Sequence, residues 1–395
     1  MAEVVEAAAR PSGDRDEIIE LNLKIEFAGQ ELARHEPPAG AFLGAYVARD
    51  NRAGDIRAFE AATGVNHAIF AYTMALEDEY PLRWVLENIA AGKAPFITLL
   101  PVEAEALAGR ETVTKLREFA ANVGQFNVPA FVQLFPLIGD HGFNFAEYTA
   151  FFRAAHSVFA HYAPNVALVW GFDTQNLADS VRFYPGRDAV DWIHLINPSP
   201  ISPSGEFGDF FSYLNFFYFA YQHERPLMVS VAVSHYSAES NAYFTHEAAA
   251  KIQNIFGRLE EYPRIKAVIY RSYNDLAASG NKFGLTGVPI ISQAYAEVSS
   301  SPHFLSFVEN TNFPRVATQI IRSPFRAIMW NYYFYIPMRA LAYDARLLWE
   351  QLESLKNLAR EINGEFFVCM ADVHEITGAD FFVDFQRRLL VLRYS

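Results

Sequence analysis

Short apolar runs without polar alternation recur along the middle of the chain. Runs of about five apolar residues are typical of strands that are buried on both faces, as in a parallel sheet. Helical patterns separate the runs, so strand and helix alternate. The runs predicted as strands are Phe42–Val47, His67–Tyr72, Phe96–Leu100, Ala130–Phe135, Ala167–Trp170, Trp192–Ile196, Leu227–Val233 and Ala267–Tyr270.

Two of the intervening helices have clear starts. Phe145–Tyr162 follows Asn144 as N-cap, with an acid three residues further on in a capping-box arrangement. His246–Leu259 follows Thr245 as N-cap and has one apolar face. Repeated strand–helix units over about 250 residues predict an α/β fold, a TIM (β/α)8 barrel, spanning residues 40–296.

The two ends of the chain follow other patterns. We expect residues 1–15 to be a flexible tail. Ile19–Phe27 alternates apolar and polar residues, which predicts a half-buried strand of a one-sided sheet. We therefore interpret residues 16–39 as a β-hairpin outside the barrel, and residues 297–308 as a linker after it.

A small domain is predicted after the linker. Phe334–Glu350 and Phe366–Phe385 repeat one pattern: a short aromatic strand, a helix that starts near Met, and a strand with an aromatic residue and an acid. This internal duplication predicts an α+β domain over residues 309–395.

Composition excludes several classes of partner. The formal net charge of −13 argues against nucleic acid and anionic membranes. No apolar run reaches about 18 residues, so we expect no membrane insertion. The single cysteine, Cys369, can form neither a disulfide within the chain nor a cysteine-based metal site. The N-terminus does not read as a signal peptide, so either the protein is not exported by that route or the numbering begins after processing.

Aromatic residues make up 15% of the chain. They suit sugar-binding surfaces, large cores and subunit interfaces, and we expect packing and interfaces to account for most of them. Phe210–Tyr221 is apolar on all sides, so a helix there would leave aromatic residues for a second domain or another chain. A membrane-surface helix is the alternative, but basic residues are missing. The candidate interface residues are Phe210, Phe211, Tyr213, Phe216, Phe217, Tyr218 and Tyr221.

Residues 40–295 resemble glycoside hydrolase family 26, the β-mannanase family of TIM-barrel enzymes. The YPG…VDW block in Phe183–Asn197 is the most specific match. The resemblance implies a retaining mechanism, with one Glu at the end of strand four as acid and another at the end of strand seven as nucleophile. The other blocks that carry the resemblance are Gly44–Asn51, Ala163–Phe172, Arg225–His235 and Tyr262–Tyr270.

The matching positions lack these carboxylates. In Gln133–Gly139 the acid position is Leu137, and the His that precedes it in the family is Pro136. In Pro226–Val231 the nucleophile position is Val231. Leu and Val can neither transfer a proton nor attack an anomeric carbon. The resemblance therefore implies a barrel without the mechanism of the family, and we lean towards a protein that is not an enzyme.

Other polar residues at strand ends could rebuild a site: Glu77, Glu103, Asp140, His141, Asp173, His235 and Asp275. Asp140–His141 and His235 could form a metal or acid/base site, but we favour solvated loop residues. No metal, phosphate-loop or nucleophile-elbow motif is present, so we predict no metal and no cofactor. Trp170 and Tyr184 could stack on a sugar, although core packing suits Trp170 equally. The candidate ligand groove comprises Tyr46, Tyr72, Asp140, His141, Trp170, Asp173, Tyr184, Asn197, His235 and Tyr270.

The C-terminal region resembles the copper amine oxidase N-terminal-like, or stalk, domain. FYIPMRALA (Phe334–Ala342) carries the resemblance, and Phe366–Phe385 repeats it more loosely. Ile19–Phe27 also looks like the opening of that module, so the barrel could be inserted into a split stalk domain. The resemblance implies a bacterial surface module that binds no copper.

Three functions remain open. The preferred one is a non-catalytic structural or interaction subunit of a bacterial surface, spore or extracellular assembly, acting through self-association or contact with other subunits. The second is a carbohydrate-binding pseudoenzyme whose old cleft holds a polysaccharide. The third is an active β-mannanase-type glycosidase with relocated carboxylates. The sequence does not fix the compartment, but the resemblances favour the cell surface, the extracellular space or a spore over the cytoplasm.

Overall fold

The chain divides into two compact units. Residues 30–317 form the barrel unit, and the residues up to Gly29 together with those from Thr318 form the small unit. The barrel unit is thus inserted between two sequence segments of the small unit. The computed structural model describes residues 18–48, 54–101, 107, 109–140, 142–274, 280–311, 315–331 and 333–394.

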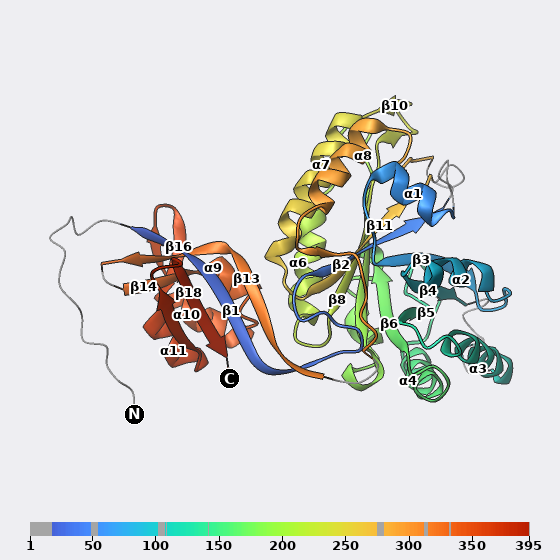
Figure 1. The fold of residues 1–395 in the computed structure, drawn as a ribbon, viewed down its shortest axis with the longest axis horizontal. Coiled ribbons are helices and arrows are strands. Elements are labelled where there is room, and N and C mark those ends of the chain that lie inside the picture. Colours follow the sequence, from blue (N-terminus) through green and yellow to red (C-terminus); the bar gives the residue numbers. More distant parts are fainter. Residues whose placement is uncertain are drawn as a thin grey trace. The chain divides into compact units, whose positions relative to one another are not determined.

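Parallel strands close the barrel (Figure 1). Neighbours in chain order pair from β2 to β11, and β11 pairs with β2 to complete the ring. All eight strands predicted from the apolar runs are present, so the predicted TIM barrel is confirmed. The strands are β2 (Ala41–Val47), β3 (Ile69–Ala75), β4 (Ala94–Leu100), β5 (Ala130–Leu134), β6 (Val166–Asp173), β7 (Trp192–Ser199), β8 (Leu227–Val233) and β11 (Ile265–Ser272).

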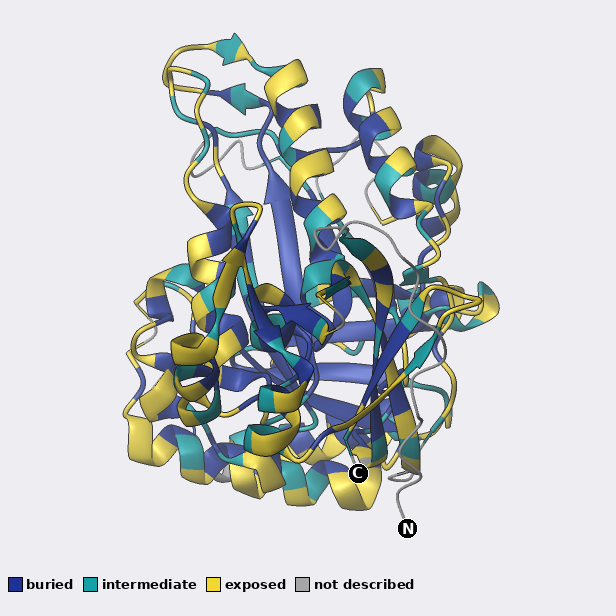
Figure 2. Cartoon of the chain, turned by 90° about the vertical axis from the view of Figure 1, so that its left-hand side faces the viewer, coloured by how far each residue is buried: buried dark blue, intermediate teal, exposed yellow. Residues whose placement is uncertain are grey.

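Helices cover the outer side of the strands, and their outward faces are exposed (Figure 2). The predicted cap of α4 is confirmed, because Asn144 Oδ1 accepts hydrogen bonds from the backbone N–H of Ala146 and Glu147. The predicted cap of α7 is wrong: the helix already includes Thr245, and Phe244 before it has no capping side chain. The helices are α1 (Ile56–Thr63), α2 (Leu82–Ala90), α3 (Arg110–Gly124), α4 (Phe145–Tyr162), α5 (Ser180–Phe183), α6 (Phe210–Tyr221), α7 (Thr245–Arg258) and α8 (Pro289–Ser299).

None of the helices in the described ranges combines the length and the apolar character that crossing a membrane requires. The longest of them, α4, has 18 residues and carries Arg153 and Glu147. Shorter 3-10 turns, η2 (Thr174–Asn176), η3 (Arg187–Ala189) and η4 (Leu259–Glu261), connect the larger elements.

Side chains alternate along each strand between the barrel interior and the helix layer. Phe96, Phe131 and Trp192 belong to one buried cluster inside the ring. The strand register links this cluster to the other strands, because Phe131 pairs with Phe96 and Ala267 pairs with Phe42. These pairings show which residues of each strand face inwards. Every second residue from them also faces inwards, up to the carboxyl end of the strand.

Two segments close the amino end of the barrel. The first is the connector before β2, where Arg34 Nη1 donates to Val166 O at 2.6 Å and Trp192 Nε1 donates to Arg34 O at 2.8 Å. The second is β12 (Phe304–Leu305), which pairs with β2. Residues 297–308 are therefore not a linker, because α8 ends within them and Leu305 and Val308 pack on the barrel core.

The small unit contains a seven-stranded sheet in the order β15-β16-β14-β13-β1-β18-β17. β1 comes from the other end of the chain and lies between β13 and β18. Its apolar residues Leu21, Leu23 and Ile25 are buried, as the alternation predicted. Residues 19–32 form one strand and not a hairpin, because the partners of β1 come from the C-terminal region. The bounds are β1 (Ile19–Leu32), β13 (Arg315–Trp330), β14 (Tyr333–Pro337), α9 (Met338–Tyr343), α10 (Trp349–Leu358), β15 (Arg360–Ile362), β16 (Glu365–Cys369), α11 (Met370–Thr377), β17 (Asp380–Asp384) and β18 (Leu389–Tyr394).

The duplication in the small unit covers a strand and a helix. β14–α9 and β16–α11 have matching junctions, with φ −63° and ψ 138° at Pro337 and φ −64° and ψ 138° at Cys369. The two strands also pair with each other, Ile336 opposite Val368. The predicted third element differs: β17 follows α11, whereas α10 follows α9 in place of a strand.

Candidate functional site

The carboxyl ends of the barrel strands form the candidate site, because ligands of TIM barrels bind there. The register places one polar or aromatic residue of most strands on the inside at this end. Among the inward-facing strand residues that the structure describes, Asp173 is the one carboxylate. Partly exposed inward-facing residues near the opening include Tyr46, Thr73, Leu100, Ile196 and Arg271.

Arg271 of β11 lies between two tyrosine rings. Its guanidinium carbon is 4.5 Å from the ring centroid of Tyr46 and 5.8 Å from that of Tyr273. The two rings meet edge to face, with centroids 6.5 Å apart. No hydrogen bond or ion pair joins the Arg271 side chain to another residue of the described ranges. This partly exposed guanidinium therefore keeps its donors for a ligand or solvent.

A second cation lies over tyrosine rings beside the first. Lys282 Nζ is 4.3 Å from the ring centroid of Tyr236 and 4.6 Å from that of Tyr243, and it donates to Tyr243 Oη. Tyr236 and Tyr243 belong to the hairpin β9 (Tyr236–Ser237) and β10 (Ala242–Tyr243), which follows β8. Tyr243 is 59% exposed.

The two groups are continuous. Phe283, next to Lys282, stacks on Tyr273 with ring centroids 4.9 Å apart, and its N–H donates to Tyr273 O. Tyr46, Tyr236, Tyr243, Arg271, Tyr273, Lys282 and Phe283 thus form one surface on the β8, β11 and β2 side of the opening, which we call the aromatic–cationic wall.

A buried polar chain lies below the opening. Thr98 Oγ1 donates to Gln133 Oε1 at 3.0 Å, His194 Nδ1 is 3.3 Å from the same oxygen, and His194 Nε2 is 2.8 Å from Ser230 Oγ. Gly171 leaves space for the Gln133 side chain, because a Cβ at position 171 would come within 2.0 Å of Gln133 Nε2. In the described part of the chain, Gln133 Nε2 has no hydrogen-bond partner.

This hydrogen-bonded series of side chains has the contacts of a nucleophile, a base and an orienting group, but a substrate has no access to it. Ser230 and His194 are each 1% exposed, so no substrate reaches the hydroxyl. Burial and the nearby charge of Arg271 lower the pKa of His194 to about 3, so its ring is neutral near pH 7. The arrangement acts as a polar core layer beneath the wall.

Leu137 and Val231, the expected positions of the lost carboxylates, do not face the opening. Val231 pairs with Tyr270 and Asn197, and the ring of Tyr270 packs on Tyr295 of α8. Val231 therefore points towards the helix layer, and its neighbours Ser230 and Ala232 point inwards. The side chain of residue 231, which the resemblance implies as the lost nucleophile position, is therefore directed away from the opening.

Leu137 is completely buried. It bridges to Phe172, whose ring packs on Phe217 and Tyr221 of α6. Phe135, two residues before it, has φ +40° and turns the chain away from the strand direction. A carboxylate at position 137 in this backbone would be buried beside the helix layer, so the structure gives this position no route to a ligand.

The other acidic candidates have structural roles or lie apart. Asp173 accepts from the N–H of Gly139, Gln175 and Asn176, which fixes the loop after β6. Glu77 is exposed and pairs with Lys115 at 3.4 Å. Asp140 is exposed and lines a hollow of about 410 Å³ over α4 and α5. The remaining candidates, Glu103, His141 and Asp275, lie outside the described residues.

Five of the predicted groove residues belong to the helix layer. Trp170 is fully buried and contacts the rings of Tyr184 and Tyr221. Asn197 Nδ2 donates to Phe210 O. Tyr72 points outwards, 5.1 Å from Trp84 of α2. Of the whole predicted groove, the residues that reach the wall are Tyr46 and His235, and the outward-facing ones are Tyr72, Trp170, Tyr184, Asn197 and Tyr270.

The predicted interface on α6 is smaller than expected. Phe210, Phe211, Phe217, Tyr218 and Tyr221 are buried within the barrel unit. Tyr213, Phe216 and Phe219 remain, with exposed fractions of 43%, 45% and 39%. Their spacing of three residues places them on one helical face.

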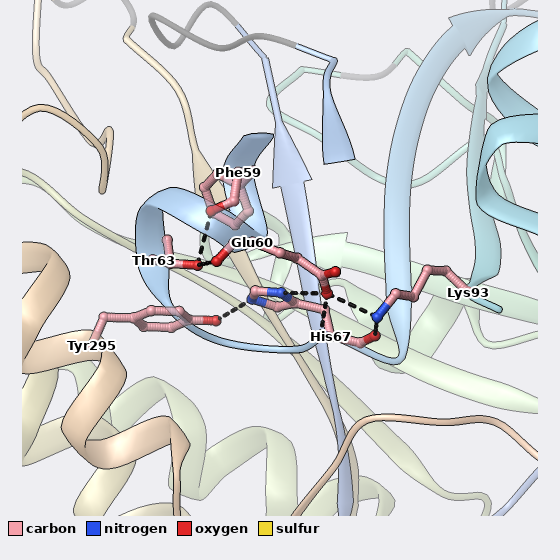
Figure 3. Close-up of polar contacts among 6 residues, drawn as sticks. All are labelled: Phe59, Glu60, Thr63, His67, Lys93 and Tyr295. Carbon is pink, nitrogen blue, oxygen red and sulfur yellow. Dashed lines mark hydrogen bonds and ion pairs between the residues drawn. The ribbon is translucent and has the colours of Figure 1, made fainter. Parts of the chain in front are cut away.

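Charged and polar side chains at the amino end of the barrel pair with one another. Glu60 Oε1 accepts from Lys93 Nζ at 2.8 Å and from the N–H of His67, and His67 Nε2 lies 2.9 Å from Tyr295 Oη (Figure 3). Burial raises the pKa of Glu60, but hydrogen bonds from His67 and Lys93 outweigh it and lower the value to about 2. Glu36 and Arg264 form a second buried pair at 2.5 Å.

The wall residues that the sequence analysis did not predict are Tyr236, Tyr243, Arg271, Tyr273, Lys282 and Phe283. A signal was available, because Ala267, Ile269, Arg271 and Tyr273 form one alternating series. The strand was instead interpreted as fully apolar up to Tyr270, the residue that faces the helices.

Comparisons with known proteins identify solved structures of similar fold. No protein-family model matches the sequence, and no curated protein matches it. A GH26 β-mannanase from Bacteroides ovatus matches in structure with a TM-score of 0.51 and 13% identity, over 69% of this chain and 92% of that chain. GH26C from a Muricauda species matches with a TM-score of 0.50 and 13% identity, over 68% of this chain and 87% of that chain. The barrel unit is therefore a TIM barrel similar in fold to those of glycoside hydrolase family 26.

Proposed function

We propose that the barrel unit is a non-catalytic saccharide-binding module that holds its ligand at the carboxyl ends of the strands. The observation that carries this proposal is the aromatic–cationic wall at the opening. Aromatic faces with a few fixed polar groups are typical of small-molecule sites, and Tyr243 presents an exposed ring. The fold, which is shared with carbohydrate-active barrels, supports the same class of ligand by analogy.

The same geometry argues against hydrolysis. Retaining hydrolysis needs two carboxylates about 5–5.5 Å apart at the ligand. Asp173 is occupied by three backbone N–H groups, and Ser230 is buried. Within the described strand ends, no second carboxylate faces the opening. We therefore infer a barrel that binds without cleaving.

The test is calorimetric titration of the full chain with oligosaccharides from mannan, glucomannan, cellulose, polygalacturonate and peptidoglycan, beside an assay for released reducing ends. We expect binding of at least one saccharide and no release. Tyr243→Ala should weaken the binding about tenfold, because it removes an exposed ring of the wall. Tyr333→Ala is the matched control, since Tyr333 is 61% exposed in the small unit. Absence of binding across the panel would refute the module, and release of reducing ends would refute its non-catalytic character.

A second candidate is an assembly subunit. The exposed face formed by Tyr213, Phe216 and Phe219 favours it, because clustered exposed aromatic residues mark interaction surfaces. The copper amine oxidase-like resemblance of the small unit and a surface, spore or extracellular location belong to this proposal. Light scattering should show mass rising with concentration, and Phe216→Glu should abolish the rise while Phe366→Glu, at a 55% exposed residue of the small unit, should not. A monomer at all concentrations would exclude self-association.

A further inference from the structure

Among the described residues, the two cations of the wall have no acidic partner. The charged groups of Arg271 and Lys282 lie against tyrosine rings and one tyrosine hydroxyl, and no carboxylate of the described residues pairs with either. The acidic residue of the hairpin tip, Glu239, is exposed, and no ion pair joins it to Lys282. The chain as a whole carries 45 acidic residues against 32 basic ones.

The rings fix both cations in place. The guanidinium of Arg271 lies over Tyr46 and the ammonium of Lys282 over Tyr236 and Tyr243, at 4.3–4.6 Å from the centroids. Stacking of this kind holds a cation without using its N–H donors on an anion. A guanidinium so held keeps a planar fork that matches the two oxygens of a carboxylate or of a sulfate ester.

Other cations of the barrel unit are paired with carboxylates. Arg264 and Lys93, at the amino end of the barrel, lie 2.5 and 2.8 Å from the carboxylates of Glu36 and Glu60. Their cations are neutralised within the fold. Arg271 faces the opening at the same depth as the partly exposed Tyr46, so a ligand can reach it from solvent.

We propose that the wall selects an anionic saccharide: a sugar chain whose carboxylate or sulfate groups bind Arg271 and Lys282 while the sugar rings lie against the tyrosines. This inference rests on the proposed saccharide-binding function and names the ligand class of that site. The two sources of the anion, uronic acid and sulfate ester, share the chemistry that Arg271 recognises, and the experiment separates them.

The test uses the full chain in calorimetric titrations with three short probes: trigalacturonate for carboxylates, a κ-carrageenan tetrasaccharide, which carries sulfate esters and no carboxylates, and mannotriose as the neutral probe. We expect one anionic probe to bind at least about tenfold more tightly than mannotriose, since hydrogen bonds between charged groups are about twice as strong as neutral ones. Raising the salt concentration should weaken this binding and leave mannotriose binding unchanged.

Two variants locate the effect. Arg271→Gln and Lys282→Gln should each weaken binding of the anionic probe about tenfold or more and weaken mannotriose binding much less. Arg339→Gln is the matched control, because Arg339 lies 5.1 Å from the ring centroid of Phe325 in the small unit and should change neither. Should a variant fail to fold by circular dichroism, the salt dependence of the unaltered protein decides the question.

The failures are distinguishable. Mannotriose binding as tightly as both anionic probes, with no salt dependence, would overturn this inference and leave the saccharide-binding function standing. Loss of binding to all probes in the unaltered protein would overturn the proposed function and the inference with it. Anionic binding that persists in both glutamine variants would place the anion elsewhere and overturn the inference alone.

Discussion

The cationic side chains at the two ends of the barrel have different partners. At the amino end, Arg264, Lys93 and the backbone groups around them are paired with Glu36 and Glu60 in buried contacts. At the carboxyl end, the cations lie on tyrosine rings and no described carboxylate neutralises them. The first arrangement stabilises the fold and leaves nothing for a ligand, whereas the second contributes little to stability and keeps charge available. Function on this barrel is therefore to be sought where pairing is incomplete.

The largest expected effect is at the amino end. Arg264→Met removes one partner of a pair whose side chains are 9% and 2% exposed, and leaves the Glu36 carboxylate buried. We expect the free energy of unfolding to fall by about 3–5 kcal/mol, measured by urea denaturation. Arg83→Met is the control, because the Arg83–Glu87 pair is exposed and its loss should cost about 0.5 kcal/mol or less. Equal effects of the two substitutions would remove the distinction between buried and exposed pairs.

The second prediction tests the buried polar side chains between the two ends of the barrel. Gly171→Ala places a Cβ within 2.0 Å of Gln133 Nε2 and 2.8 Å of His194 O, so the polar chain must shift. We expect a loss of about 1–3 kcal/mol in the free energy of unfolding. Gly257→Ala, in α7, meets no atom within 4 Å and should stabilise the protein by about 0.5–1 kcal/mol. A neutral Gly171→Ala would mean that Gln133 has room to move.

The third prediction concerns the stability of the fold at low pH. Burial lowers the pKa of His35 to about 4 and that of His194 to about 3, from an ordinary value of 6.5. The unfolded chain therefore binds protons that the folded chain does not, and stability falls as pH drops from about 6.5 to about 4, by about 1.4 kcal/mol per pH unit for each histidine.

His194→Gln removes one of these titrating groups and keeps a side chain that can hydrogen-bond to Ser230. Urea denaturation at pH 7, 6, 5 and 4 should give a slope that is smaller by about 1.4 kcal/mol per pH unit than in the unaltered protein. An unchanged slope would show that His194 is already charged in the folded state, against the interpretation of a neutral polar layer.

The smallest expected effect on stability is at the carboxyl end. Arg271→Gln loses contacts with Tyr46 and Tyr273 and no described ion pair. We expect a change of about 1 kcal/mol or less in the free energy of unfolding, measured as for Arg264→Met. A loss as large as that of Arg264→Met would make Arg271 a structural residue and erase the difference between the two ends.

The sequence predicts the barrel well and its site poorly, for different reasons. Each strand is a local apolar run such as Leu227–Val233, which nearby residues alone define. The direction of a side chain needs the register, and an error of one residue reverses it. That is why Val231 was expected at the opening although Ser230 and Ala232 face inwards.

The contacts between the parts of the wall could not be predicted, because those parts are distant in the chain. Tyr46 and Arg271 become neighbours through the β2–β11 pairing that closes the ring. The loop that carries Lys282 joins the hairpin of Tyr236 through a single bridge. No local pattern marks either contact, whereas the alternation in Ile19–Phe27 did predict the burial of β1.

The insertion of the barrel between β1 and β13 has a consequence during synthesis on the ribosome. β1 leaves the ribosome before its neighbours in the sheet, β13 and β18, which follow only after the roughly 290 residues of the barrel unit. At about 5–20 residues per second, β1 waits about 15–60 s with its apolar side chains uncovered. The barrel has that interval to fold as one continuous segment, and the small unit is completed last, when the final strand is released.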